Sequence, residues 1–177
     1  MTIRQSVIFG LLGAALVIGA VPGQAAPTGA APVHRITHTD REWKRLLTPA
    51  QYTVLRQSGT DEPYKGAYWN NHNKGTYVCA GCSLPLFTSD AKFDSGTGWP
   101  SFWQPIQKDH VLQKEDDSLG TVRTEVTCAR CGGHLGHVFD DGPQPTGLRY
   151  CMNSNAMKFI PAPKSSASAK MPSGKKP

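Results

Sequence analysis

Acidic residues are scarce in this chain of 177 residues, which has 13 Asp and Glu against 19 Lys and Arg and a net charge of +6. No acidic residue follows Asp141, and the last residues, 162–177, contain four lysines. This tail, rich in Pro, Ser, Ala and Lys, is too poor in apolar residues to order itself. Since the tail holds most of the excess charge, the remainder is nearly balanced, and we do not expect a nucleic-acid-binding surface.

The chain also lacks an apolar run long enough to span a membrane. The uncharged stretch 7–21 falls short of the roughly 18 residues that a spanning helix needs. It follows Arg4 and precedes small residues around Ala25, the three parts of a secretory signal. We predict cleavage near Ala25 and an exported protein, periplasmic or secreted, without stable membrane insertion once processed. Retention of the segment as a membrane anchor is the alternative.

Helical patterns are few and lie near the start of the chain. Thr48 suits an N-cap, Pro49 the first helical position and Gln51 the closing position of a capping box. They predict a helix over 50–58, preceded by a shorter helical turn around Trp43.

Eighteen glycines and fourteen prolines favour a turn-rich, mainly β architecture. Short strands are predicted over 76–79, 84–87, 121–127 and 148–153. The predicted organisation is a signal peptide (1–25), a flexible linker (26–37), one folded domain (38–161) and a disordered basic tail (162–177).

The last predicted strand determines where a solitary cysteine points. Side chains two apart on a strand share a face, so Leu148, Tyr150 and Met152 are expected to face the core. Three polar or reactive side chains share the opposite face: Arg149, Cys151 and Asn153.

The other four cysteines form two C-x-x-C pairs, Cys79 with Cys82 and Cys128 with Cys131. Two such pairs can supply four thiolates to one structural Zn²⁺ ion. The alternatives are two disulfides, which export would favour, and a redox-active C-x-x-C pair. The redox motif normally opens a helix, and neither pair precedes a helical pattern. Zinc is therefore the preferred interpretation.

Cys151 has the neighbours that a nucleophilic thiol requires. A nearby cation or hydrogen-bond donor stabilises a thiolate, and Arg149 shares its strand face. Either His134 or His137 could donate a proton to a developing oxyanion, and Asp141 could orient an imidazole. A purely structural role for the histidines is the alternative.

Trp99 is the candidate wall of an apolar pocket. The following Pro100 restricts it to an extended backbone, and Gly96 and Gly98 permit sharp turns around it. A buried indole in the core is the alternative.

Four motifs in this order resemble those of the B type of peptide methionine-R-sulfoxide reductases: GTDEPYKGAY, KFDSGTGWPSF, RTEVTCARCGGHLGHVFDDGP and GLRYCMNSNAMKF. The resemblance spans nearly all of residues 38–161. It implies a mainly β, tent-like fold of two antiparallel sheets with a few short helices at its edge. It also implies that Cys151 attacks the sulfoxide sulfur of R-configured methionine sulfoxide in proteins or peptides, giving methionine and a sulfenic acid.

Further site roles follow from the same resemblance. Trp99 would pack on the substrate methyl group, and the four paired cysteines would match the zinc-bearing members. The polar side of the pocket would be formed by His134, His137, Asp141, Arg149 and Asn153.

One position departs from the family pattern. Many members have a resolving cysteine where this chain has Thr97. A sulfenic acid on Cys151 is then expected to react directly with an outside thiol, such as a thioredoxin-like protein or another reductant. Reduction by one of the four paired cysteines after loss of the metal is the alternative. We expect a monomeric enzyme that repairs oxidised exported proteins. The competing hypothesis is a zinc-ribbon binding module in which Cys151 is inert.

Overall fold

The computed structural model describes residues 32–118 and 120–163. The predicted signal peptide, half of the linker and almost all of the tail lie outside these residues and stay predictions. Part of the predicted linker contacts the domain: Val33 and Ile36 pack against the core, and the Ile36 amide donates to the Arg130 carbonyl (2.8 Å). Within the described ranges no helix has the length and apolar character needed to cross a bilayer.

The fold is mainly β, as predicted, with two antiparallel sheets in the described part of the chain. One sheet has the strand order β2-β1-β9 and the other β3-β4-β8-β7-β6-β5. The strands are β1 (Gly75–Cys79), β2 (Pro85–Thr88), β3 (Lys92–Phe93), β4 (Ser101–Phe102), β5 (Val111–Asp116), β6 (Arg123–Cys128), β7 (His134–Phe139), β8 (Arg149–Met152) and β9 (Met157–Pro161). The helices are α1 (Asp40–Leu46) and α2 (Pro49–Gln57), with 3₁₀ turns η1 (Ser89–Ala91), η2 (Lys108–His110) and η3 (Ser154–Ala156).

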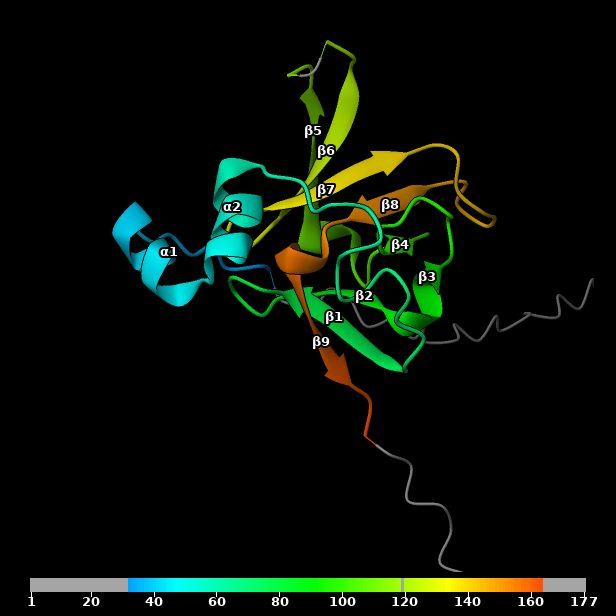
Figure 1. Cartoon of the computed structure of the whole chain (residues 1–177), viewed down its shortest axis with the longest axis horizontal. Coiled ribbons are helices and arrows are strands. Elements are labelled where there is room, and N and C mark those ends of the chain that lie inside the picture. Colours follow the sequence, from blue (N-terminus) through cyan, green and yellow to red (C-terminus); the bar gives the residue numbers. More distant parts are fainter. Residues whose placement is uncertain (1–31, 119, 164–177) are drawn as a thin grey trace, which may run out of the picture. The chain divides into compact units, whose positions relative to one another are not determined.

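Figure 1 shows both helices at one side of the sheets, and β5 and β6 as a hairpin that projects from the large sheet. Strand β8 lies between β4 and β7 in that sheet, so Tyr150 and Cys151 each have a partner on both sides. Antiparallel neighbours bring the side chains of opposing residues onto one face. Any reactive side chain on β8 is therefore flanked by two fixed neighbours.

Both helices begin at a capping box. Thr48 accepts a hydrogen bond from the Gln51 amide and donates its own amide to the Gln51 side chain, which confirms the predicted start of α2. Thr39 and Glu42 form the same arrangement on α1. Helix α2 ends at Gln57, and Ser58 takes a left-handed conformation, so the predicted helix was one residue too long.

Aromatic side chains join the two sheets in the core. The rings of Phe87 on β2 and Phe102 on β4 are stacked, with centroids 4.4 Å apart. Tyr77 on β1 meets Phe102 edge-on at 5.0 Å, and burial raises the pKa of Tyr77 to about 12. These contacts hold the small sheet against the strands that carry the candidate site.

Strand β6 differs from its prediction in two respects. It begins at Arg123 rather than residue 121, and Val122 is 72% exposed. Glu125 lies only 6% exposed because it pairs with buried His134, a contact that the alternation of residues 121–127 does not reveal.

Gly136 allows β7 to approach β8 closely. Its φ is +154°, and a Cβ at this position would lie 2.1 Å from the main-chain oxygen of Cys151. A side chain there would displace the backbone of β8. The glycine thus helps to set the distance between the strand of His137 and the strand of Cys151.

Candidate active site and metal centre

Cys151 lies in the middle of β8 and faces away from the core. The strand alternates half-buried and buried residues, as predicted, with Tyr150 and Met152 inward. Cys151 is directly opposite His137 of β7 on one side and Ser101 of β4 on the other. The sheet register therefore places an imidazole and a hydroxyl beside the thiol.

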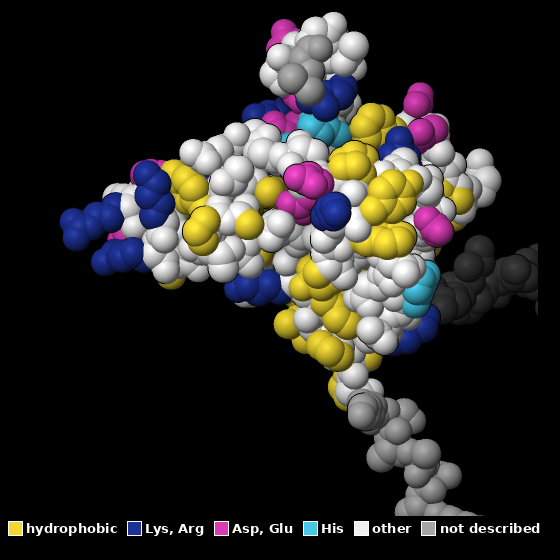
Figure 2. All heavy atoms as spheres, viewed as in Figure 1, with side chains coloured by type: hydrophobic (Ala, Val, Ile, Leu, Met, Phe, Trp, Pro, Cys, Tyr) yellow, Lys and Arg dark blue, Asp and Glu magenta, His cyan; other side chains and the backbone are white. Residues whose placement is uncertain are grey.

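Cys151 opens into a cavity of about 130 Å³. Its lining combines apolar and polar side chains from strands and loops distant in sequence: Thr60, Trp99, Arg123, Gly136, His137, Phe139, Cys151 and Asn153. Figure 2 shows hydrophobic side chains gathered beside a histidine below the projecting β5–β6 hairpin. A small ligand with one apolar and one polar end matches this lining.

Trp99 is a wall of the cavity rather than core filler. The indole is half-buried, and its Nε1 donates to the main-chain oxygen of Asp61 (2.9 Å). The Asp61 carboxylate is itself held by the amide and side chain of Asn155 (2.9 and 2.7 Å). This chain of bonds fixes the indole relative to Cys151.

Asn153 lies just beyond β8, where it is 3% exposed. Its Oδ1 accepts from the Asp61 amide (2.9 Å), and its Nδ2 donates to the Leu135 carbonyl (3.2 Å). The side chain lines the cavity and also ties the segment around Asp61 to the sheet.

The environment of Cys151 contains opposing influences on its thiol. Burial raises the pKa of Cys151, whereas a contact with Thr97 Oγ1 (3.9 Å) and the positive charge of Arg149 act to lower it. Thr97 also contacts Ser95 (2.8 Å), which in turn contacts Ser101 (2.7 Å). A short chain of hydroxyls thus ends at the sulfur.

The two predicted histidines are each held by a carboxylate that the sequence analysis did not identify. His137 Nε2 donates to Asp116 Oδ2 (2.7 Å), and His134 Nδ1 donates to Glu125 Oε1 (2.6 Å). Hydrogen bonds from Ser118 and from His137 hold the pKa of Asp116 well below its usual range. The ionised carboxylate therefore accepts a hydrogen bond from Nε2 and fixes the orientation of the His137 imidazole.

His134 and Asp141 lie outside the Cys151 cavity. His134 lines an adjoining polar cavity of about 330 Å³, and burial lowers its pKa. Asp141, expected to orient an imidazole, instead accepts Nε and Nη2 of Arg149, both at 2.8 Å. Arg149 stacks on Phe139 (4.3 Å from guanidinium carbon to ring centroid), so Asp141 positions a cation rather than a histidine.

Sequence reasoning missed three charged residues of the site: Asp116, Arg123 and Glu125. Arg123 and Asp116 are register partners across β5 and β6, and Glu125 pairs with His137 across β6 and β7. The alternation of residues 121–127 was a signal for Arg123 and Glu125, because it placed both on one strand face, but it did not indicate which strand lies beside them. No pattern in the sequence pointed to Asp116.

The four paired cysteines come together at the junction of the two sheets. Their sulfur atoms all lie within 4.8 Å of one another, with 3.6 Å between Cys79 and Cys131 and 3.5 Å between Cys82 and Cys128. Tetrahedral Zn²⁺ with Zn–S bonds of about 2.3 Å places its sulfurs about 3.8 Å apart. The cluster fits one such ion, and the separations exceed the roughly 2.05 Å of a disulfide.

Main-chain amides support the same cluster. The amides of Leu84 and Gly133 donate towards the sulfurs of Cys82 and Cys131, which favours thiolates. A Cβ on Gly133 would meet the Leu55 side chain of α2 at 2.8 Å, so the second cysteine pair packs closely against this helix. The four thiolates leave no open position for substrate, so the cluster fits a structural role.

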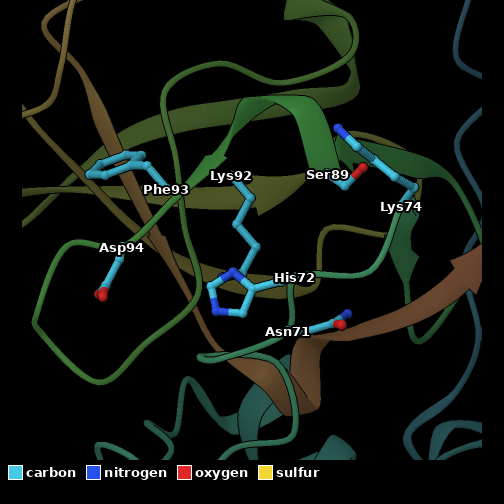
Figure 3. A pocket seen from close by; sticks show the side chains of 7 residues that line it. All are labelled: Asn71, His72, Lys74, Ser89, Lys92, Phe93 and Asp94. Atoms are coloured by element: carbon cyan, nitrogen blue, oxygen red, sulfur yellow. The ribbon is translucent and has the colours of Figure 1, made fainter.

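A second polar cavity, of about 200 Å³, lies along β3 (Figure 3). Its lysines already have partners: Lys74 pairs with Asp90 (2.7 Å), and Lys92 donates to the Trp69 carbonyl (2.9 Å). None of the predicted site residues lines it, and we assign it no function.

Fold and site place one cysteine thiol in a small cavity that has an apolar and a polar side. A family model described as the SelR domain matches residues 47–161. A peptide methionine sulfoxide reductase MsrB of Leptospira interrogans is 55% identical over 126 residues, covering 71% of this chain and 96% of the relative.

A relative with the same name from Bradyrhizobium diazoefficiens is 58% identical, and the match covers 72% of this chain and 91% of the relative. Another from Methanosarcina barkeri is 56% identical, and the match covers 70% of this chain and 87% of the relative. The chain therefore belongs to the SelR-domain family of peptide methionine sulfoxide reductases, MsrB type. The resemblance of the four motifs is confirmed, and reduction of methionine sulfoxide is the activity that membership establishes.

Proposed function

We propose that this enzyme reduces the R epimer of protein- or peptide-bound methionine sulfoxide with Cys151 as its nucleophile. The observation that carries the proposal is the register that places Cys151 opposite His137 in a cavity walled by Trp99. The Cys151 sulfur attacks the sulfoxide sulfur, and the sulfoxide oxygen takes up a proton and passes to the cysteine. Methionine leaves, and Cys151 is oxidised to a sulfenic acid.

The two walls of the cavity give each substituent of the sulfoxide a place. The S-methyl group packs on the indole of Trp99, and Phe139 extends the apolar wall. The oxygen, which gains negative charge, lies towards His137, whose imidazole is oriented by Asp116. Arg149, held by Asp141, stabilises the thiolate by its charge. Asn153 completes the polar side of this cavity, and His134 lies beside His137 in the adjoining polar cavity.

Epimer selectivity tests this arrangement. In the S epimer the methyl group and the oxygen exchange places, and the oxygen would lie against the indole of Trp99, whose Nε1 already donates to Asp61. We therefore expect kcat/KM for the R epimer to exceed that for the S epimer by at least about 100-fold. The assay uses both epimers of one sulfoxide-containing peptide with dithiothreitol as reductant. Equal rates, or a preference for the S epimer, would contradict the proposal.

We further propose that an outside thiol reduces the sulfenic acid directly. Thr97 occupies the position nearest to Cys151 on the loop before Trp99, and its hydroxyl cannot form a disulfide. The other four cysteines are gathered in the separate cluster, where Zn²⁺ would hold them. A thioredoxin-like protein or another thiol would form a mixed disulfide with Cys151, releasing water, and a second thiol would restore the free cysteine.

Bound Zn²⁺ would cross-link the two sheets and would take no part in the reaction itself. We also propose that the enzyme acts as a monomer. The export predicted from residues 1–25 makes oxidised periplasmic or secreted proteins its proposed substrates.

A further inference from the structure

Asp61 connects the two sides of the Cys151 cavity from outside it. Its main-chain oxygen accepts a hydrogen bond from Nε1 of Trp99, and its amide donates to Oδ1 of Asn153, both at 2.9 Å. Trp99 belongs to the apolar side of the cavity and Asn153 to the polar side, whereas Asp61 is not among the residues that line it. The main chain of Asp61 therefore holds a group on each side of the space where the sulfoxide would lie.

The side chain of Asp61 ties this main chain to the strand that carries Cys151. Its Oδ2 accepts the amide of Asn155 at 2.9 Å, and its Oδ1 accepts Nδ2 of the same residue at 2.7 Å. Asn155 lies in η3, two residues after the end of β8. Hydrogen bonds to an ionised carboxylate are roughly twice as strong as those between neutral groups, so these two form a firm clasp between the loop and η3.

The loop that contains Asp61 depends on such a clasp. Residues 58–62 form neither helix nor strand, and the residues on both sides of Asp61 are exposed while Asp61 is half-buried. A bond from the Tyr64 amide to the Gly98 carbonyl (2.9 Å) attaches the loop to the segment before Trp99, not to β8. Without the carboxylate, the loop and the indole could therefore shift together relative to Cys151.

The position of the indole matters because the cavity is small. Its volume is about 130 Å³, and Trp99 and Cys151 both line it. A pocket of fixed size distinguishes ligands that differ by one methylene by about 10–200-fold. A wall held at one distance from the sulfur therefore accepts an S-methyl group and disfavours an S-ethyl group, and a wall that yields loses this discrimination.

We propose that the Asp61 carboxylate is a positioning group that fixes Trp99 relative to Cys151 and thereby makes the enzyme selective for S-methyl sulfoxides. Asp61 touches neither the substrate nor the reacting sulfur and acts through the indole. The inference rests on the proposed reaction at Cys151. It adds a determinant of which sulfoxides that reaction accepts.

The test compares two substrates that differ by one methylene. They are the N-acetyl N-methylamides of methionine sulfoxide and of ethionine sulfoxide, both with the R configuration at sulfur. In the wild type, kcat/KM for the methyl compound should exceed that for the ethyl compound by at least about tenfold. We expect Asp61→Ala to lower this ratio at least about fivefold, mainly through a higher KM for the methyl compound, with its kcat within about twofold of the wild type.

A conservative variant separates the hydrogen bonds from the charge. Asp61→Asn keeps one acceptor for the Asn155 amide, and its Nδ2 can donate to Oδ1 of Asn155 when that side-chain amide turns over. We therefore expect Asp61→Asn to retain a methyl-to-ethyl ratio within about twofold of the wild type.

Two further variants complete the set. Asn155→Ala removes the 2.7 Å bond and leaves the main-chain bond, so it should lower the ratio by a smaller factor, about twofold to threefold, and it replaces Asp61→Ala if that variant does not fold. Asp90→Ala removes the aspartate of the exposed pair with Lys74 and should leave the ratio unchanged.

The contrary outcomes are distinct. An unchanged ratio in both Asp61→Ala and Asn155→Ala, even with a lower kcat on both substrates, would overturn the inference and leave Asp61 a general structural role. A loss in Asp61→Asn as large as that in Asp61→Ala would also overturn it, because hydrogen bonds and not charge form the clasp. A wild-type enzyme inactive on both compounds would instead contradict the proposed function.

Discussion

Replacement of Cys151 by serine is expected to lower kcat for peptide methionine sulfoxide by about 10⁴-fold or more. Serine lacks the polarisable sulfur that attacks the sulfoxide and cannot store the transferred oxygen as a sulfenic acid. Neither the adjacent His137 nor Arg149 can take over this covalent step. The measurement is methionine release from a sulfoxide peptide under saturating substrate and dithiothreitol.

The same variant distinguishes an enzyme from a zinc-binding module with an inert thiol. Cys151 is half-buried and lies outside the four-cysteine cluster, so the serine variant should keep its metal content and its thermal unfolding midpoint. A folded variant with wild-type turnover would support the binding module. An unfolded variant would show that the side chain is structural.

Loss of the metal is expected to unfold the domain. Cys79 ends β1 in the small sheet and Cys128 ends β6 in the large one, so the cluster links the two sheets. Structural Zn²⁺ contributes about 10–16 kcal/mol of apparent binding free energy in small domains, against a total stability of about 5–15 kcal/mol. Cys128→Ser, or treatment with a strong chelator, should therefore abolish the near-ultraviolet circular dichroism and the cooperative thermal transition.

Metal analysis of the same samples completes this experiment. One Zn²⁺ per chain is expected in the purified wild type and none in Cys128→Ser, while Cys151→Ser serves as the matched cysteine control with full metal content. A metal-free protein that unfolds at the same midpoint as the wild type would contradict a structural role for the cluster.

Local patterns predicted much of the fold. The Thr48 capping box identified the start of α2, and the two C-x-x-C pairs identified a cluster that brings two sheets together. Alternation along residues 148–153 showed correctly that Cys151 faces away from Tyr150. The helix cap and the strand alternation depend on residues within a few positions of one another, where backbone geometry fixes the outcome. The two cysteine pairs are far apart in sequence, and the ligand chemistry of zinc was the reason to join them.

Contacts set by strand pairing could not be predicted in this way. Asp116 and His137 are too far apart in sequence for a helix or strand period to relate them, and so are Glu125 and His134. Each pair meets only through the register of β5, β6 and β7. Asp141 was assigned to an imidazole because it follows His137 closely in sequence. In the structure Asp141 accepts hydrogen bonds from Arg149 instead, because β7 and β8 run side by side.

The same limit applies to Arg123. Its buried and unpartnered Nε is a property of three-dimensional packing, and no motif in the sequence distinguishes it from a surface arginine. Register and burial together thus added an orienting carboxylate for each histidine.

The most direct test of the central claim is the mass of the chain after one turnover. Reduced protein, freed of small thiols, is mixed with one equivalent of the R-sulfoxide peptide, and methionine release and intact mass are recorded with peptide mapping. We predict one methionine per chain and a protein heavier by one oxygen atom, located on Cys151. A protein lighter by two hydrogen atoms, with Cys151 in an internal disulfide, would contradict direct reduction. Methionine release with Cys151 unmodified and no such disulfide would contradict its role as the nucleophile.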